Sequence, residues 1–157
     1  MFSHFNKNKK PKIVDIGNKR ITKRTAIAKG IVKFSKSTFK KLDAFTSKKG
    51  EINNIAILAG IIGAKKTSEL IPLCHNIKLE NIDIDIKKNN KLSSLIVTAK
   101  VDANAKTGVE MESLTAVSIA CLTIYDMCKS VDKKISITDI RLIKKTGGKS
   151  NLRVSKK

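Results

Sequence analysis

A long, mostly apolar helix is predicted between Met111 and Val131, and it constrains the fold more than any other segment. Its apolar residues recur at spacings of three and four: Leu114, Val117, Cys121, Ile124 and Cys128. This spacing places them on one stripe, which must be buried against another layer of structure. No apolar run reaches the roughly 18 residues that a membrane helix needs. We therefore expect this helix to pack on a sheet in a protein core.

The remaining pattern predicts that sheet. Residues 81–86 (NIDIDI) alternate apolar and polar side chains, as a half-buried strand does, and 94–101 form the hairpin partner across a KNNK turn. Further strands are expected at 13–16, 23–33 and 135–143, the last with an irregularity near Asp139. Two more helices are expected, one capped by Ser35 and one over 52–70 that Pro72 stops. The order β-β-α-α-β-β-α-β predicts an α+β sandwich with helices on one face of a mostly antiparallel sheet.

The length of 157 residues and the hydrophobic content of 41% suit one compact domain, which we place at 13–157. The basic segment 1–12 has no apolar stretch of a signal peptide and is expected to be a disordered tail, a short transit peptide being the alternative. Cys74, Cys121 and Cys128 form no CxxC pair, and only two His are present, so no metal site is expected. We interpret the three cysteines as reduced thiols of a cytoplasmic protein.

The net charge of +20 allows two interpretations. Positive charge of this size is typical of proteins that bind nucleic acid, phosphate ligands or anionic membrane surfaces. However, only four of the 33 basic residues are arginines, and Ile and Asn are abundant. That skew is what AT-rich codons give, so compositional drift on a solvated surface also explains the charge.

The predicted long helix carries several charged side chains, although most of its residues are apolar or small. Asp126 and Lys129 lie three residues apart, away from the Cys121 stripe, and an ordinary surface ion pair would explain them. Their charge-poor neighbourhood instead favours a buried site or a subunit contact. Glu110 and Glu112 stand at the start of the helix, where they either favour the helix dipole or accept hydrogen bonds from a purine-like ring.

Three loops could complete a site. His75, in ELIPLCHNI, is either a packing residue or a proton carrier held after a rigid turn. TSKKGE, with Lys49, and KKTGGKSN, with Lys145 and Lys149, are either solvated loops or cradles for a triphosphate. Neither has the order of a Walker A motif.

Together these motifs resemble the cyclic pyranopterin monophosphate synthase family, the accessory protein C of molybdenum cofactor biosynthesis. The resemblance rests on LAGIIGAKKTSELIPLCH, TGVEMESLTAVSIACLTIYDMCKSV and IRLIKKTGGKS, with IVDI as the opening strand. It covers the chain from Ile13 to Ser150, in the expected order and spacing.

The resemblance implies a ferredoxin-like α+β subunit, a homohexamer built as a trimer of dimers, and active sites at the dimer interface. The implied substrate is a GTP-derived 3′,8-cyclo intermediate, supplied by a radical S-adenosylmethionine partner enzyme. The implied reaction is a lyase reaction that yields cyclic pyranopterin monophosphate and releases pyrophosphate. No cofactor is required, although Mg²⁺ could accompany the pyrophosphate. Neither a membrane nor a specific nucleic acid is an expected partner.

Residue by residue, the resemblance makes Asp126, Lys129 and Lys49 catalytic. It assigns substrate binding to the PLCH and VEME loops and to basic groups that meet the phosphates: Leu73, Cys74, His75, Met111, Glu112, Glu110, Arg24, Lys145 and Lys149. Because like charges disfavour the charged form, we also expect neighbouring lysines to depress the pKa of Lys49 and Lys129.

The chain departs from the family pattern at four positions: Asn76, Glu51, Ile57 and Asn151. None of them is an assigned catalytic residue. A basic nucleic-acid-binding module is the alternative function, although base stacking needs exposed aromatics, which the predicted strands lack. An oligomer that has lost activity is the third possibility.

Overall fold

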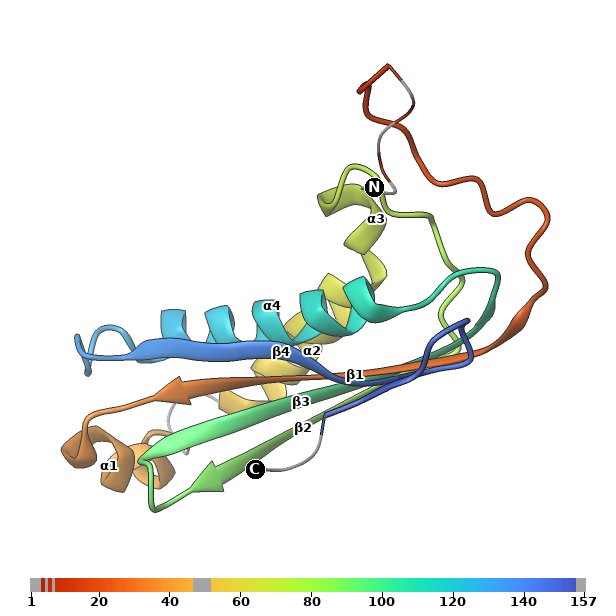
Figure 1. Ribbon diagram of the computed structural model, residues 1–157. Helices are drawn as coiled ribbons and strands as arrows, with labels where there is room; N and C mark the ends of the chain where they lie inside the picture. Colours follow the sequence, from red (N-terminus) through yellow and green to blue (C-terminus); the bar gives the residue numbers. More distant parts are fainter. Residues whose placement is uncertain (1–3, 5, 7, 47–51, 155–157) are drawn as a thin grey trace.

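The computed structural model describes His4, Asn6 and residues 8–46 and 52–154 (Figure 1). Its elements in chain order are β1 (Thr22–Lys33), α1 (Lys36–Thr46), α2 (Ile52–Lys65), α3 (Thr67–Leu70), β2 (Asn81–Asn89), β3 (Ser94–Ala105), α4 (Glu110–Cys128), β4 (Ser136–Thr146) and β5 (Leu152–Arg153). The strands form one antiparallel sheet in the order β2-β3-β1-β4-β5. Helices α2 and α4 lie on the same face of this sheet (Figure 1). The predicted α+β sandwich is therefore confirmed.

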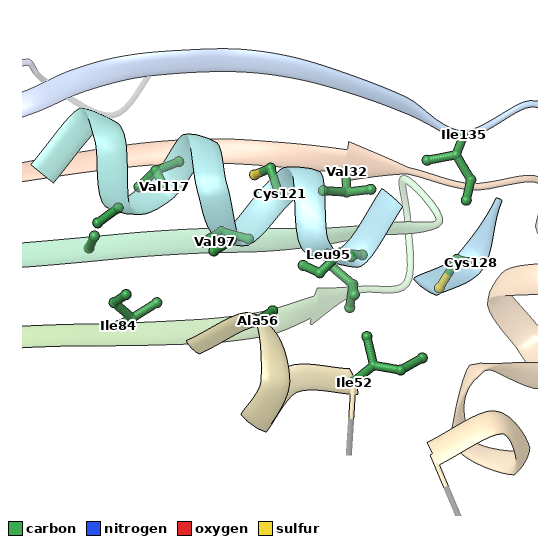
Figure 2. Close-up of a cluster of buried hydrophobic side chains, with 14 of the residues drawn as sticks. Val32, Ile52, Ala56, Ile84, Leu95, Val97, Val117, Cys121, Cys128 and Ile135 are labelled. Atoms are coloured by element: carbon green, nitrogen blue, oxygen red, sulfur yellow. The ribbon is translucent and has the colours of Figure 1, made fainter. Parts of the chain in front are cut away.

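The core lies between the sheet and α4, as the spacing of the apolar stripe predicts. Strands β1 and β3 pair so that Val32 is opposite Leu95 and Gly30 opposite Val97. Figure 2 shows Val117 and Cys121 of α4 above Val32 and Val97, and all four side chains are completely buried. By length and composition alone α4 could cross a membrane, but this packing explains its apolar character.

Small residues on α2 allow it to approach α4 closely. A Cβ atom added to Gly60 would lie 2.9 Å from the carbonyl oxygen of Ala116 and 2.6 Å from Ile84 Cδ1. One added to Gly63 would lie 2.8 Å from Ile119 Cγ1. The small-residue face of this helix therefore serves the core of the subunit.

Replacing Gly60 by Val is expected to lower the free energy of unfolding by about 2–3 kcal/mol, because the added atoms force α2 away from α4. Denaturant unfolding monitored by circular dichroism measures this. Leu58→Val, on the exposed side of the same helix, is the matched control and should stay within about 0.5 kcal/mol of the wild type. Equal stabilities for the two variants would contradict the close approach.

Three predicted element boundaries are wrong. Residues 13–16 form no strand and lie outside the sheet. The helix expected over 52–70 is broken at Lys66, where the hydroxyl of buried Thr67 donates to the carbonyl of Ala64 at 3.0 Å. The short strand β5 was not predicted. The irregularity at Asp139 is confirmed, since this residue has a φ of 57° and the β1–β4 register shifts beside it.

Asp132 joins the turn after α4 to the start of α1. Its carboxylate accepts hydrogen bonds from the backbone N–H groups of Ser35 at 2.8 Å and Lys134 at 2.9 Å. Burial raises the pKa of Asp132, but these hydrogen bonds outweigh burial, and the pKa lies below the usual 3.8. Ser35 in turn caps α1, because its hydroxyl accepts the N–H of Thr38 at 3.3 Å.

Asp132→Ala is expected to lower the free energy of unfolding by about 2–3 kcal/mol at pH 7, because two partly buried hydrogen bonds to a carboxylate are lost. A depressed pKa stabilises the fold above pH 3.8. The difference from the wild type should therefore shrink as the pH falls through the folded-state pKa. Denaturant unfolding across pH 2.5–7 checks this, with about 0.5 kcal/mol or less expected for Asp85→Ala, whose ion pair with Lys87 is exposed. A pH-independent difference would be the contrary result.

Candidate functional site

An open, basic pocket of about 800 Å³ lies where β1 and α4 begin and β4 ends. It collects cationic side chains from five segments of the chain: Lys19, Arg20, Arg24, Lys106, Lys145 and Lys149. Two carboxylates, Asp15 and Glu110, also line it. This excess of positive charge suits a polyanion such as a chain of phosphates.

Protein acceptors orient two of these cations. The guanidinium of Arg24 donates to the carbonyls of Ala105 at 3.2 Å and Lys106 at 3.3 Å. The ammonium of Lys145 lies 3.1 Å from Oε1 of Glu110. Arg24 and Lys145 are therefore held in place before any ligand arrives.

The glycine loop after β4 depends on Gly147. Its φ is +87°, and a Cβ atom there would overlap the carbonyl oxygen of Lys23. The hydroxyl of Thr22 donates to the carbonyl of Gly147 at 2.8 Å. The loop that carries Lys149 is thus held against the start of β1, and Arg24, Lys145 and Lys149 line the same pocket.

Beside this pocket, the PLCH and VEME motifs meet. Glu112 is only 4% exposed, and its Oε2 has no hydrogen-bond partner among the described residues. Burial raises the pKa of this carboxyl to about 7, with a smaller contribution from the charge of Glu110. Burial, and then the charge of Glu112, raise the pKa of the Cys74 thiol. Glu112 can therefore exchange a proton near neutral pH, as catalytic carboxyl groups do.

His75 is held by the chain that precedes β1. Its Nε2 donates a hydrogen bond to the carbonyl of Val14 at 2.7 Å. Leu73 lies half-buried in the turn after α3, and Met111 is 37% exposed on the first turn of α4. Of the residues predicted from these two motifs, Cys74 and Glu112 are close enough to interact, and His75 contacts the chain before β1.

Asp126 and Lys129 form an ion pair at the other end of α4. The ammonium of Lys129 lies 2.6 Å from Oδ1 of Asp126, and both side chains are exposed. The hydrogen bond and the charge of Asp126 raise the pKa of Lys129. The prediction that other lysines depress this pKa is therefore wrong for the subunit, because the nearby carboxylate has the larger effect.

The structure does not bring all the predicted residues together in one subunit. Glu112 and Asp126 are 14 positions apart on one helix, which corresponds to about 21 Å. The basic pocket lies at the start of α4, and Figure 1 shows the two ends of α4 near opposite ends of the sheet. Lys49 lies outside the described residues. The site residues of one subunit therefore form two separate groups.

Sequence reasoning missed three residues that line the pocket: Lys19, Arg20 and Lys106. No local signal distinguished them among 33 basic residues, because the fold alone brings these segments to the end of β1. Among the described residues, no three His, Cys, Asp or Glu side chains lie close enough to hold a metal ion.

Comparisons with known proteins agree with this geometry. The model of the MoaC family matches residues 13–148. A protein of Clostridium botulinum named cyclic pyranopterin monophosphate synthase is 50% identical over 149 residues, which are 95% of this chain and 94% of that protein. A protein of the same name from Helicobacter pylori is 48% identical over 150 residues, 96% and 95% of the two chains. Another from Lysinibacillus sphaericus is 50% identical over 151 residues, 95% and 94% of the two chains.

Proposed function

Because this chain belongs to the MoaC family, we infer that it catalyses the synthesis of cyclic pyranopterin monophosphate, a lyase reaction of molybdenum cofactor biosynthesis. The substrate is derived from GTP. We propose that it is the 3′,8-cyclo intermediate and that a radical S-adenosylmethionine enzyme supplies it. The observation that carries this proposal is a basic pocket bordered by a buried carboxyl whose pKa is about 7.

The triphosphate of this substrate would occupy the basic pocket. Arg24, Lys145 and Lys149 would meet its phosphate oxygens, with Arg24 held in place by two backbone carbonyls. Forming the cyclic phosphate requires a ribose hydroxyl oxygen to attack the α-phosphorus while pyrophosphate leaves. The cations stabilise the charge that develops on the leaving pyrophosphate. Any Mg²⁺ would travel with the pyrophosphate oxygens.

The ring portion of the substrate would lie toward Glu112 and His75. Opening a purine ring and closing a pterin ring each require protons to be moved. A carboxyl whose pKa is about 7 can accept or donate a proton at neutral pH. The orphaned Oε2 of Glu112 is then an acceptor for a ring N–H of the substrate.

The second group, Asp126 and Lys129, would reach this substrate from another copy of the chain. A Lys side chain cannot span the roughly 21 Å between the two ends of α4. The outer face of α4 exposes Met111, Leu122 and Tyr125, which favours contact with a second copy. An antiparallel pairing of two α4 helices about a two-fold axis near Ile119 would set Asp126 of one opposite Glu112 of the other.

Further apolar surface supports assembly beyond a dimer, and we propose the homohexamer. On α2, Ile55, Leu58 and Ile62 are 41%, 59% and 48% exposed, more apolar surface than an isolated subunit usually leaves on one helix. Cys74, Cys121 and Cys128 are free thiols, which favours a cytoplasmic location.

The test is direct: the purified protein is incubated with the isolated cyclo-GTP intermediate. Cyclic pyranopterin monophosphate and pyrophosphate should form in equal amounts. A protein that binds the intermediate without converting it would be an inactive relative. If the protein does not bind the intermediate but binds RNA with a steep salt dependence, the nucleic-acid-binding module is the better description.

A further inference from the structure

The chain that leads into β1 forms one rim of the basic pocket. Residues 14–20, here called the N-terminal strap, contribute Asp15, Asn18, Lys19 and Arg20 to the pocket lining. Figure 1 shows this segment passing the chain between α3 and β2 before it enters β1. We propose that the strap is a working part of the site, with two tasks. It holds His75 in one tautomer, and its Lys19 and Arg20 bind the phosphate chain; this rests on the function proposed above.

Two hydrogen bonds tie the strap to its neighbours, and a third shapes its turn. His75 Nε2 donates to the carbonyl of Val14 at 2.7 Å. The backbone N–H of Gly17 donates to Oδ1 of Asp15 at 2.8 Å, which closes a tight turn. The ammonium of Lys106, which also lines the pocket, donates to the carbonyl of Gly17 at 2.7 Å. The strap is therefore tied to both the His75 loop and the loop before α4.

The bond to Val14 decides the chemistry of His75. A carbonyl oxygen only accepts, so Nε2 must carry a proton. Neutral His75 then has its lone pair on Nδ1, the nitrogen that can accept a proton or a hydrogen bond from a substrate ring. Without the strap, both tautomers would be populated. The Val14 carbonyl is thus a positioning group that acts on substrate through His75.

The strap also adds positive charge to the pocket, where several other cationic side chains already contact protein acceptors. Lys145 is paired with Glu110, Arg24 donates to two carbonyls, and Lys106 donates to Gly17. Lys19 and Arg20 stand exposed at the rim of the same pocket. They can bind the phosphate chain of the entering substrate and the pyrophosphate that leaves. Their contribution is to binding, so they should affect KM and product inhibition more than kcat.

The charge assignment is tested with inorganic pyrophosphate as the probe, by calorimetry on the full chain. Lys19→Gln and Arg20→Gln should each weaken pyrophosphate binding about threefold to tenfold, since each removes one partly exposed cation. Lys12→Gln removes an equal charge from the chain just before the strap, outside the pocket lining, and should leave binding unchanged. Equal affinity in all three variants and the wild type would overturn the assignment. Because no turnover is needed, this result is independent of whether the cyclo-GTP intermediate is the substrate.

The tautomer is tested by ¹⁵N NMR. The chain has two histidines, so His4→Gln leaves His75 as the only imidazole. Its nitrogens should show one dominant tautomer with the proton on Nε2. In that background Asp15→Ala, which removes the acceptor of the strap turn, should reduce this preference, whereas Asp15→Asn, which keeps an acceptor, should preserve it. A tautomer mixture like that of free imidazole in the His4→Gln protein would overturn the positioning role.

Discussion

Lys129→Ala is expected to lower kcat for conversion of the cyclo-GTP intermediate by about a thousandfold, the range that loss of a general acid or base produces. The ammonium of Lys129 is exposed and pairs with Asp126 on the surface of α4, so its removal leaves the core unchanged. Single-turnover formation of cyclic pyranopterin monophosphate is the measurement. Unchanged thermal unfolding would show that the loss is chemical.

Two further variants make the Lys129 result specific. Lys133→Ala removes an exposed lysine four positions away and should retain near-wild-type kcat. Lys129→Arg keeps the charge, but a guanidinium does not give up its proton at any physiological pH. It should therefore bind substrate and fail in turnover. Wild-type kcat in Lys129→Ala would remove this residue from the mechanism.

The fold was predictable because its strongest signals are periodic. The stripe from Leu114 to Cys128 and the alternation of residues 81–86 each state which side chains are buried, and the structure buries them against one another. The element boundaries were less predictable, because they depend on contacts across the chain. The helix breaks between α2 and α3 at Lys66, for example, beside a buried Thr67 whose hydroxyl donates to the carbonyl of Ala64. The apolar character of residues 13–16 is typical of a strand, yet the structure leaves them outside the sheet.

The sequence named candidate site residues but did not predict how the fold arranges them. The sequence did not say whether one chain or two supply each site, whereas the structure shows that α4 holds Glu112 and Asp126 at opposite ends. Only the geometry of the helix separates them by about 21 Å. Lys19, Arg20 and Lys106 were missed for the opposite reason, since the fold gathers them although nothing local marks them. The prediction of a disordered 1–12 tail remains a prediction.

The separation of the two groups leads to a test by subunit mixing. Lys129→Ala and Glu112→Gln should each be inactive alone: the first removes the ammonium, and the second removes the carboxyl that exchanges protons near neutral pH. When the two variants are unfolded together and refolded as a mixture, activity should return. The physical reason is that each site would take Lys129 from one copy and Glu112 from the other.

The expected recovery is quantitative. An isologous dimer has two equivalent sites. In a mixed dimer, one site receives both substitutions and the other receives neither, so half of its sites are native. Random pairing makes half of the dimers mixed, and the mixture should therefore regain about one quarter of the wild-type kcat per chain. If all residues of a site came from one chain, every site would carry one substitution, and the mixture would stay as inactive as its parents. Lys133→Ala mixed with Glu112→Gln provides the control. The Lys133→Ala protein is active before mixing, so activity in this mixture does not have to arise from combining two inactive chains.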